Sequence, residues 1–402
     1  MRRIFFFVVL LIVYGSLYPW HFVWRQLPAN PLWILWHSQD LQFNRFLVRD
    51  TVVNIALYAP LGMSGYLAFR KRLWLPLLTG LILSVCVELV QLFVPGRTTS
   101  ILDVMTNVTG TVAGLGLGVL FENIGGARRA PVRARAGSAR TADRDALILL
   151  FLWIGLLLFP FFPQVGLSVP LHRIRIFFGT SFFEPVAFLS ALVSWFAAGK
   201  VMGAARVRPS LRWLGFSILA VPAQFFIAMR QPQPSDLLGA VTGFLLFAGL
   251  RRIPGITRLL AAAFLLTILI RGLAPFGFVP QAADFSWIPF GGFLNTEWQY
   301  GILVLLEKGF YYGTAIWLLR ASGFRLFSAA AITAVLLAII EVAQIHLPGR
   351  TAEITDPLLA IVLAFALGIG SRERENEKER QREMERSGNR HRQQHNKSMG
   401  RG

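Results

Sequence analysis

Two segments of this chain carry the same polar residues at the same spacing inside otherwise apolar sequence. In each segment a Gln, an Arg and an Asp follow a Glu at positions +3, +9 and +15, and a Pro-Gly pair precedes the Arg. The second copy starts 253 residues after the first (341 minus 88). Ionisable residues beside lipid are costly, so their default interpretation is functional or architectural. The two sets are Glu88, Gln91, Arg97 and Asp103, and Glu341, Gln344, Arg350 and Asp356.

A degenerate third copy lies between these two. Gln224, Arg230 and Asp236 keep the spacing, but Val221 stands in place of the Glu. A similar apolar opening precedes each copy. The three openings are Leu17-Tyr18-Pro19, Leu158-Phe159-Pro160 and Leu273-Ala274-Pro275. The sequence therefore predicts three related units, an arrangement typical of duplicated membrane modules.

Pairs of polar residues in the first unit stand about one helical turn apart, so the members of each pair share a helix face. The pairs are Asp50 with Asn54, Glu88 with Gln91, and Asp103 with Asn107. We expect the pairs to converge near the outer headgroup level. Arg97 follows a Pro-Gly turn, and its guanidinium suits a carboxylate or a phosphate.

Two interpretations of this cluster stay open at this point. Arg97 could bind an anionic ligand, or it could pair with Glu88 or Asp103 and lock two helices together. Paired carboxylates could also act as general acids or bases, although the sequence shows no nucleophile beside them. In the third unit Glu307 occupies the place of Asn54, and it is expected to join Glu341, Arg350 and Asp356.

Composition excludes a soluble protein. The chain is 54% hydrophobic and 15% charged, with a mean hydropathy of +0.55. Apolar segments recur that are long enough to cross the hydrocarbon core of a bilayer. We expect an all-α polytopic membrane protein with about twelve spans, four in each unit. The expected spans are 4–19, 51–69, 74–93 and 101–121; 146–163, 181–203, 211–229 and 235–250; and 256–273, 300–319, 326–346 and 355–370.

The net charge of +19 is concentrated in loops on one side of the predicted spans. By the positive-inside rule this side and both termini are cytoplasmic, and the Pro-Gly-Arg loops face outward. The same rule explains the basic charge without nucleic acid as a partner. The expected division of the chain is a first unit 1–124, a basic cytoplasmic linker 125–145, a degenerate second unit 146–252, a third unit 253–370, and a disordered charged tail 371–402.

Small residues line two of the predicted spans at helical spacing, which favours close helix packing. They are Gly110, Gly114, Gly116 and Gly118 in one span and Gly239 and Gly243 in another. The six histidines have no metal-ligand spacing, so neither a metal nor a cofactor is expected.

The first unit resembles the VanZ-like family. The resemblance is carried by Asp50-x3-Asn54-x3-Tyr58-x-Pro60-Leu61-Gly62, followed by Glu88-x2-Gln91-x5-Arg97-x5-Asp103-x3-Asn107-x2-Gly110. It covers about residues 10–122, the third unit resembles the family more loosely, and the middle unit has lost the pattern. The resemblance implies a bacterial integral membrane protein of the cytoplasmic membrane, with a link to the cell envelope and to resistance against glycopeptides of the teicoplanin type.

Several functions fit these observations. The first is the binding of an anionic ligand, a membrane lipid or a lipid-linked envelope precursor, at the extracytoplasmic face. The alternatives are an outer-leaflet enzyme with Glu88 or Glu341 as general base, a transporter, and a purely structural scaffold. The nearly apolar helix middles argue against a transporter. Whether the protein is an enzyme stays open, and between the first two functions we favour binding over catalysis.

Overall fold

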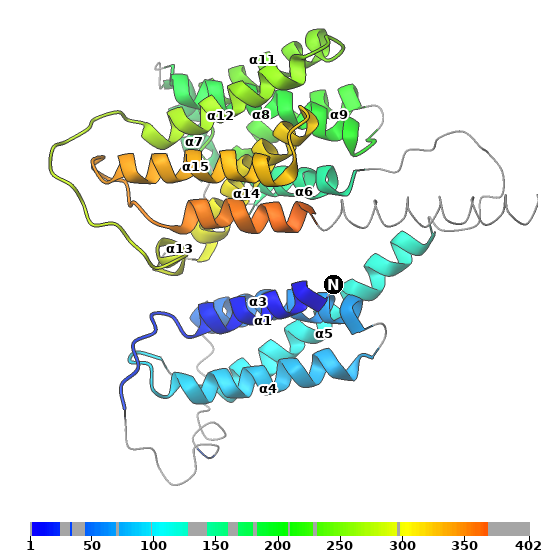
Figure 1. The fold of residues 1–402 in the computed structure, drawn as a ribbon, viewed down its shortest axis with the longest axis vertical. Helices are drawn as coiled ribbons and strands as arrows, with labels where there is room; N and C mark the ends of the chain where they lie inside the picture. The colour runs from blue at the N-terminus through cyan, green and yellow to red at the C-terminus, as the bar shows by residue number, and fades with distance from the viewer. Residues whose placement is uncertain are drawn as a thin grey trace, which may run out of the picture. The chain divides into compact units, whose positions relative to one another are not determined.

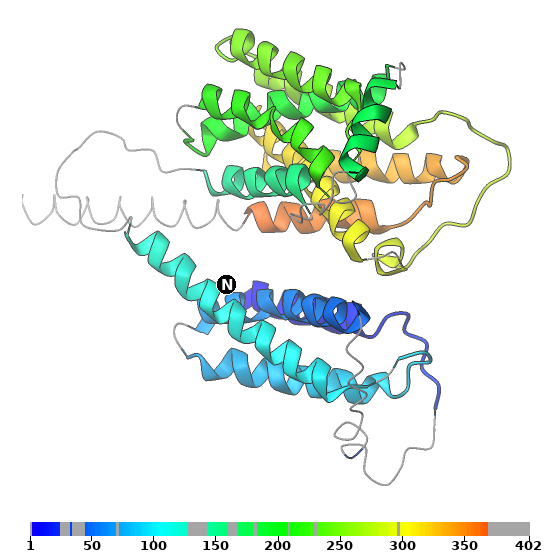
Figure 2. The same cartoon turned by 180° about the vertical axis from the view of Figure 1, so that it is seen from behind.

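The computed structural model shows an all-helical protein in the part of the chain that it describes (Figures 1 and 2). This part comprises residues 2–24, 33, 45–69, 72–97, 99–127, 143–159, 168–179, 183–207, 210–227, 231–295 and 298–368. The chain divides into two compact units, Met1–Ser138 and Ala139–Gly402. The expected tail and most of the expected basic linker lie outside the described residues. The finer division of the chain into three related units stays a prediction.

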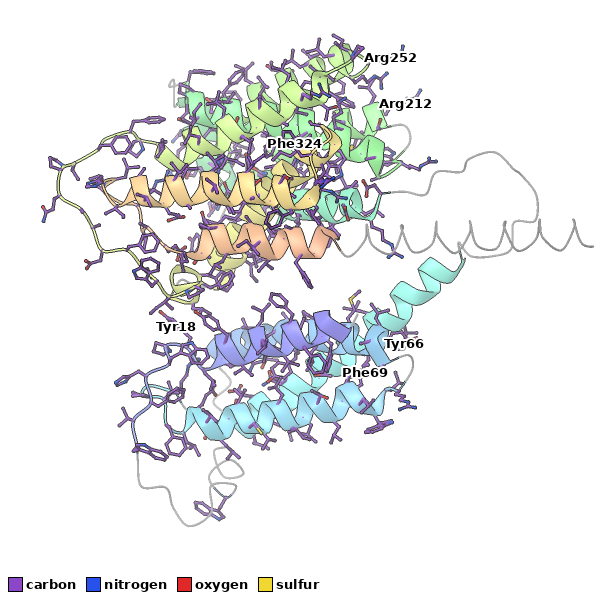
Figure 3. All side chains as sticks on the ribbon, viewed as in Figure 1. Tyr18, Tyr66, Phe69, Arg212, Arg252 and Phe324 are labelled. Carbon is purple, nitrogen blue, oxygen red and sulfur yellow. The ribbon has the colours of Figure 1, made fainter. Side chains whose placement is uncertain are left out.

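Four long helices make up most of the described residues of the first unit. They are α1 (Arg2–Ser16), α3 (Arg45–Phe69), α4 (Trp74–Gln91) and α5 (Ile101–Ala127). Tyr18 lies at one end of this unit, and Tyr66 and Phe69 lie at the other (Figure 3). The buried core comprises Phe5, Ile12, Tyr58 and Leu61. All four motif residues of this unit lie in α4, in the loop after it and in the first turn of α5.

Glycines bring α5 into close contact with α3. A Cβ on Gly114 would lie 1.9 Å from the carbonyl oxygen of Ala59, and one on Gly110 would lie 2.5 Å from that of Ile55. These positions therefore exclude any side chain, and the predicted role of the small residues is confirmed here. Gly116, by contrast, would meet nothing within 4 Å.

The second unit packs its remaining helices around two buried ones, α8 (Pro185–Ala204) and α14 (Trp298–Ala321). Their most buried residues include Phe310, Ala315 and Ile316. Gly239 and Gly243 allow close packing on α8, since a Cβ on either would meet a backbone oxygen within 2.5 Å. The surrounding helices are α6 (Arg144–Leu158), α7 (Ser168–Gly179), α9 (Ser210–Ser217), α10 (Ala220–Ala223), α11 (Pro234–Leu250), α12 (Ile256–Leu273), α13 (Gly291–Asn295), α15 (Leu326–Gln344) and a last apolar helix, Thr355–Gly368.

The expected number of spans is not confirmed. Among the described residues, five helices are long and apolar enough to cross a membrane, and four further apolar helices are shorter. The segment expected as one span at 211–229 is broken into α9, α10 and a 3-10 turn, Gln224–Phe226. Pro222 lacks an N–H group, and the Ser217 hydroxyl bonds the Leu214 carbonyl at 2.5 Å, so continuous helix is disfavoured there. Helix α7 forms between the expected spans 146–163 and 181–203, in a segment for which no span was expected.

Candidate functional site

The motif glutamine ties the end of one helical segment to the end of an earlier helix. Its side-chain amide donates a hydrogen bond to a backbone carbonyl. The residue with this carbonyl stands three positions before the proline of the apolar opening (Leu-x-Pro) that precedes each copy of the motif. That carbonyl belongs to the last turn of a helix, where backbone acceptors lack intrahelical partners. The bond occurs in all three predicted units. The three bonds are Gln91 to Ser16 (2.8 Å), Gln224 to Leu157 (3.0 Å) and Gln344 to Gly272 (2.8 Å).

The motif glutamate holds the far end of the Pro-Gly-Arg loop. Glu88 Oε2 accepts a hydrogen bond from the Ser100 N–H at 3.0 Å, and Glu341 Oε2 accepts one from the Glu353 N–H at 2.7 Å. Both donors lie twelve residues after their glutamate. Each carboxylate is buried, with 3% exposure for Glu88 and 2% for Glu341. A buried carboxylate that bonds the backbone fixes the loop at the start of the following helix.

The degenerate unit satisfies the same backbone donor in another way. The Val221 side chain cannot accept a hydrogen bond, and the N–H twelve residues later belongs to Gln233. The Asp236 carboxylate accepts from this N–H at 2.9 Å, as part of a capping box at the start of α11. The loss of the glutamate therefore leaves no unpaired backbone donor there.

The Pro-Gly-Arg loops themselves share one backbone conformation. Gly96 and Gly349 have φ of 80° and 78°, values that favour glycine. An extended segment after the preceding Leu-x-Pro sequence pairs with each loop. Val23 N–H bonds the Phe93 carbonyl at 2.8 Å, and Val279 N–H bonds the His346 carbonyl at 2.9 Å. The two loops thus share the φ value of their glycine and the backbone hydrogen bond to the extended segment.

The two arginines of these loops differ. Arg350 donates three hydrogen bonds of 2.8 to 3.1 Å to the carbonyls of Arg271 and Ala274, at the end of α12. Arg97 is exposed and interacts electrostatically with Glu88, and its guanidinium makes no hydrogen bond to a described residue. Arg350 therefore acts as a cap of a helix end, whereas Arg97 presents its donors to the surroundings.

The interior of the first unit carries short polar contacts between helices. Asn54 Nδ2 donates to Asp103 Oδ1 at 2.9 Å, and Asn107 Nδ2 donates to Ser84 Oγ at 2.9 Å. Asn107 Oδ1 is buried without a hydrogen-bond partner among the described atoms. The side chain of Asp50 lies outside the described residues, as does Arg230 of the degenerate copy.

The third unit replaces these contacts with a charged cluster. Lys308 Nζ lies 2.5 Å from Asp356 Oδ1 and 3.8 Å from Glu353 Oε1. The Tyr312 hydroxyl donates to Asp356 Oδ2 at 2.5 Å. Glu341 joins this cluster through the Glu353 N–H. One cation thus interacts with three carboxylates, those of Asp356, Glu353 and Glu341.

Glu307 does not contact the residues that it was expected to join. It pairs with Arg271, whose guanidinium also lies 4.5 Å from the centre of the Tyr311 ring. On α14, the residues that contact Asp356 are Lys308, which directly follows Glu307, and Tyr312, which directly follows Tyr311. They correspond to Asn54 and Tyr58 with an offset of 254 (308 minus 54), whereas the motif repeats with an offset of 253. Because the two offsets differ by one residue, aligning the units in sequence pointed to Glu307 and did not identify Lys308 and Tyr312.

Comparison with known proteins agrees with the resemblance of the first unit. Residues 5–122 match the family model described as VanZ/LLP1. No curated protein sequence and no solved structure matches the chain. In the described part of the chain, no group of three or more His, Cys, Asp or Glu residues is arranged to hold a metal ion.

Proposed function

Taking the VanZ/LLP1 match of residues 5–122 as the premise, we propose that this membrane protein binds an anionic ligand through Arg97. The ligand is the charged headgroup of a membrane lipid or of a lipid-linked envelope precursor, at the extracytoplasmic face. The observation that carries the proposal is the contrast between the two arginines. Arg350 is occupied by backbone carbonyls, whereas Arg97 stands exposed on an equivalent loop without a hydrogen-bond partner among the described residues.

The loop around Arg97 supports binding because it is held at both ends. Gln91 anchors its start and Glu88 anchors its end, so the Arg97 backbone is fixed before a ligand arrives. A loop whose backbone is already fixed loses less conformational entropy when it binds a ligand. The fork of donors of the guanidinium suits the paired oxygens of a phosphate or carboxylate.

An enzymatic role is less well supported. A general base needs a free carboxylate within reach of the proton that it removes. The carboxylates of Glu88 and Glu341 are buried and each already accepts a backbone hydrogen bond. These contacts favour a positioning role for both glutamates.

The test is native mass spectrometry of the full chain purified in mild detergent. We compare wild type, Arg97→Gln and Arg350→Gln for co-purified phosphate-bearing lipid. We expect the lipid to be retained by wild type and by Arg350→Gln, and to be lost from Arg97→Gln. Equal retention in wild type and Arg97→Gln, together with a lower melting temperature of Arg97→Gln, would instead identify Arg97 as a helix lock.

A binding role in the envelope also predicts a cellular effect. Expression of the wild-type chain is expected to change susceptibility to teicoplanin-type glycopeptides, which the resemblance of the first unit implies. Expression of Arg97→Gln at the same level is expected to leave susceptibility as in cells without the protein. The level of each variant in the membrane is measured by immunoblot, so that loss of protein is distinguished from loss of binding.

A further inference from the structure

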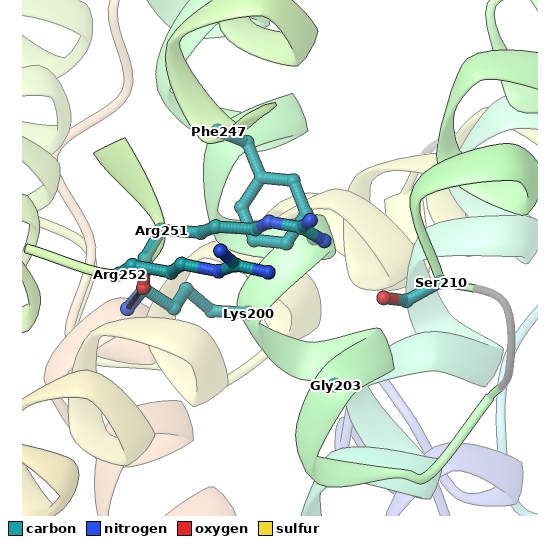
Figure 4. Close-up of a pocket in the computed structure, with 7 residues that line it drawn as sticks. Lys200, Gly203, Ser210, Phe247, Arg251 and Arg252 are labelled. Atoms are coloured by element: carbon teal, nitrogen blue, oxygen red, sulfur yellow. Dashed lines mark hydrogen bonds between the residues drawn. The ribbon is translucent and has the colours of Figure 1, made fainter. Parts of the chain in front are cut away.

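A basic cavity lies in the second unit. Arg252, one of the residues that line it, lies at the end of this unit opposite the loop 274–290 (Figures 1 and 3). The volume of the cavity is about 370 Å³. Helix α8 contributes Lys200, the turn after α11 contributes Arg251 and Arg252, and the start of α9 contributes Ser210. Figure 4 shows both guanidinium groups extending across the cavity toward the side where the Ser210 hydroxyl lies.

Among the described residues, no acidic side chain compensates the positive charges of this cavity. No acidic residue lines it, and no ion pair joins Lys200, Arg251 or Arg252 to a described residue. The Lys200 ammonium instead donates to the Arg251 carbonyl at 3.4 Å. A different basic residue of this unit, Arg320, is paired with the buried Asp145 at 2.8 Å. Three neighbouring cations repel one another, and an anion between them removes that repulsion.

The cavity is open because a side chain is missing from its wall. A Cβ on Gly203 would meet nothing within 4 Å. A Cβ on Gly199 would instead lie 2.6 Å from the Phe247 ring, so α8 and α11 are tightly packed where these two residues line the cavity. The lining of the cavity thus combines a buried aromatic ring with charged donors.

Helix α9 continues the cavity into an apolar surface. Ser210, Trp213 and Phe216 are spaced by three residues and so lie along one helix face. Trp213 and Phe216 are 55% and 68% exposed, and their ring centres lie 6.4 Å apart. Exposed aromatic side chains of this kind favour the interface between headgroups and acyl chains.

We propose that this cavity binds a phosphate group, carried by an anionic membrane lipid whose acyl chains lie against Trp213 and Phe216. By the positive-inside rule the basic loops of this end mark the cytoplasmic leaflet, which is opposite the face assigned to Arg97. Basic pockets between transmembrane helices on the cytoplasmic side suit such headgroups. The site is thus independent of the ligand proposed for the first unit.

The test titrates the purified full chain with phosphatidylglycerol, phosphatidylcholine or inorganic phosphate, and measures bound ligand by native mass spectrometry. The variant Arg251→Gln/Arg252→Gln removes two guanidinium groups from the cavity. The control variant Arg212→Gln/Arg258→Gln removes the same charge from two exposed arginines that do not line it. We expect phosphatidylglycerol to bind wild type and the control alike, and the cavity variant about tenfold or more weakly, because charge-assisted hydrogen bonds are lost.

A second variant, Gly203→Phe, fills the cavity without removing any charge. Since nothing lies near the Gly203 Cβ position, we expect this variant to fold and to lose phosphatidylglycerol as well. Binding of inorganic phosphate that follows the same pattern of variants supports the anion site and makes free phosphate its ligand. The proposal is overturned if phosphatidylglycerol and phosphate bind the cavity variants as tightly as wild type, or if the control loses as much.

Discussion

The charged cluster of the third unit makes a quantitative prediction for Lys308→Met. Lys308 is the one described cation in contact with Asp356 and Glu353, whose side chains are 9% and 12% exposed. Removing one partner of a buried ion pair typically costs about 3–5 kcal/mol, because the other charge is left without compensation. The Lys308 side chain is 27% exposed and Tyr312 still donates to Asp356, which places the expected loss at about 3 kcal/mol.

The prediction is tested by a double-mutant cycle on the full chain in mixed micelles. Unfolding by increasing SDS is followed by circular dichroism for wild type, Lys308→Met, Asp356→Leu and the double variant. We expect the double variant to lose about 2 kcal/mol less than the sum of the single losses, because the two side chains interact directly. If the two compact units unfold in separate transitions, we expect only the transition of the second unit to move.

A matched control separates the ion pair from loss of positive charge in general. Arg325 is exposed just before α15, and Arg325→Gln is expected to change stability by no more than about 0.5 kcal/mol. The reasoning is refuted if Lys308→Met costs less than about 1 kcal/mol, or if the losses in the cycle simply add. Either result would mean that the cluster is solvated or rearranged, and not a buried charge pair.

The remaining predictions concern the contacts that hold the loops and helices. Gln344→Leu is expected to cost about 1 kcal/mol in the same assay, because it leaves a helix-end carbonyl unpaired, and an unchanged stability would contradict the capping role. Glu88→Gln keeps an acceptor oxygen and is expected to retain the fold and lipid binding, whereas Glu88→Leu is expected to lose both. If Glu88→Gln is stable but loses a measured catalytic activity, that result would instead support an enzyme. Gly114→Ala is expected to lower the melting temperature by several degrees, because its Cβ would clash with a carbonyl oxygen at 1.9 Å, while Gly116→Ala, which meets nothing, is expected to hold or raise it. Similar melting temperatures for these two variants would contradict the close approach of α3 and α5.

Much of the helical architecture follows from apolar segments and their punctuation. The span expected at 256–273 coincides with α12, and those at 235–250 and 326–346 differ from α11 and α15 by one or two residues. A continuous span was expected at 211–229 because the composition of this segment is apolar. The proline inside the segment interrupts the helix, so the prediction was wrong. An apolar segment can be long enough to span a bilayer and still break where the backbone lacks a donor.

The candidate site was predicted in its members but not in its contacts. Repetition identified Glu88, Gln91 and their counterparts, because polar residues in register stand out against apolar sequence. The repeat could not show that the motif glutamine donates a hydrogen bond to the end of a helix, or that Arg350 donates hydrogen bonds there too. Both acceptors are backbone carbonyls more than seventy residues away in sequence, so no side-chain pattern marks them.

The sequence by itself determined that the chain is helical and suited to a membrane, that its first unit is VanZ-like, and which polar residues recur. Tertiary structure alone decided the partners of those residues. The clearest case is α14, where Lys308 and not Glu307 meets Asp356. A shift of one residue turns a side chain by about 100° around a helix. Alignment of the repeats therefore does not reveal which side chain of a neighbouring helix faces a motif residue. Only the packed structure places Lys308 against its carboxylates.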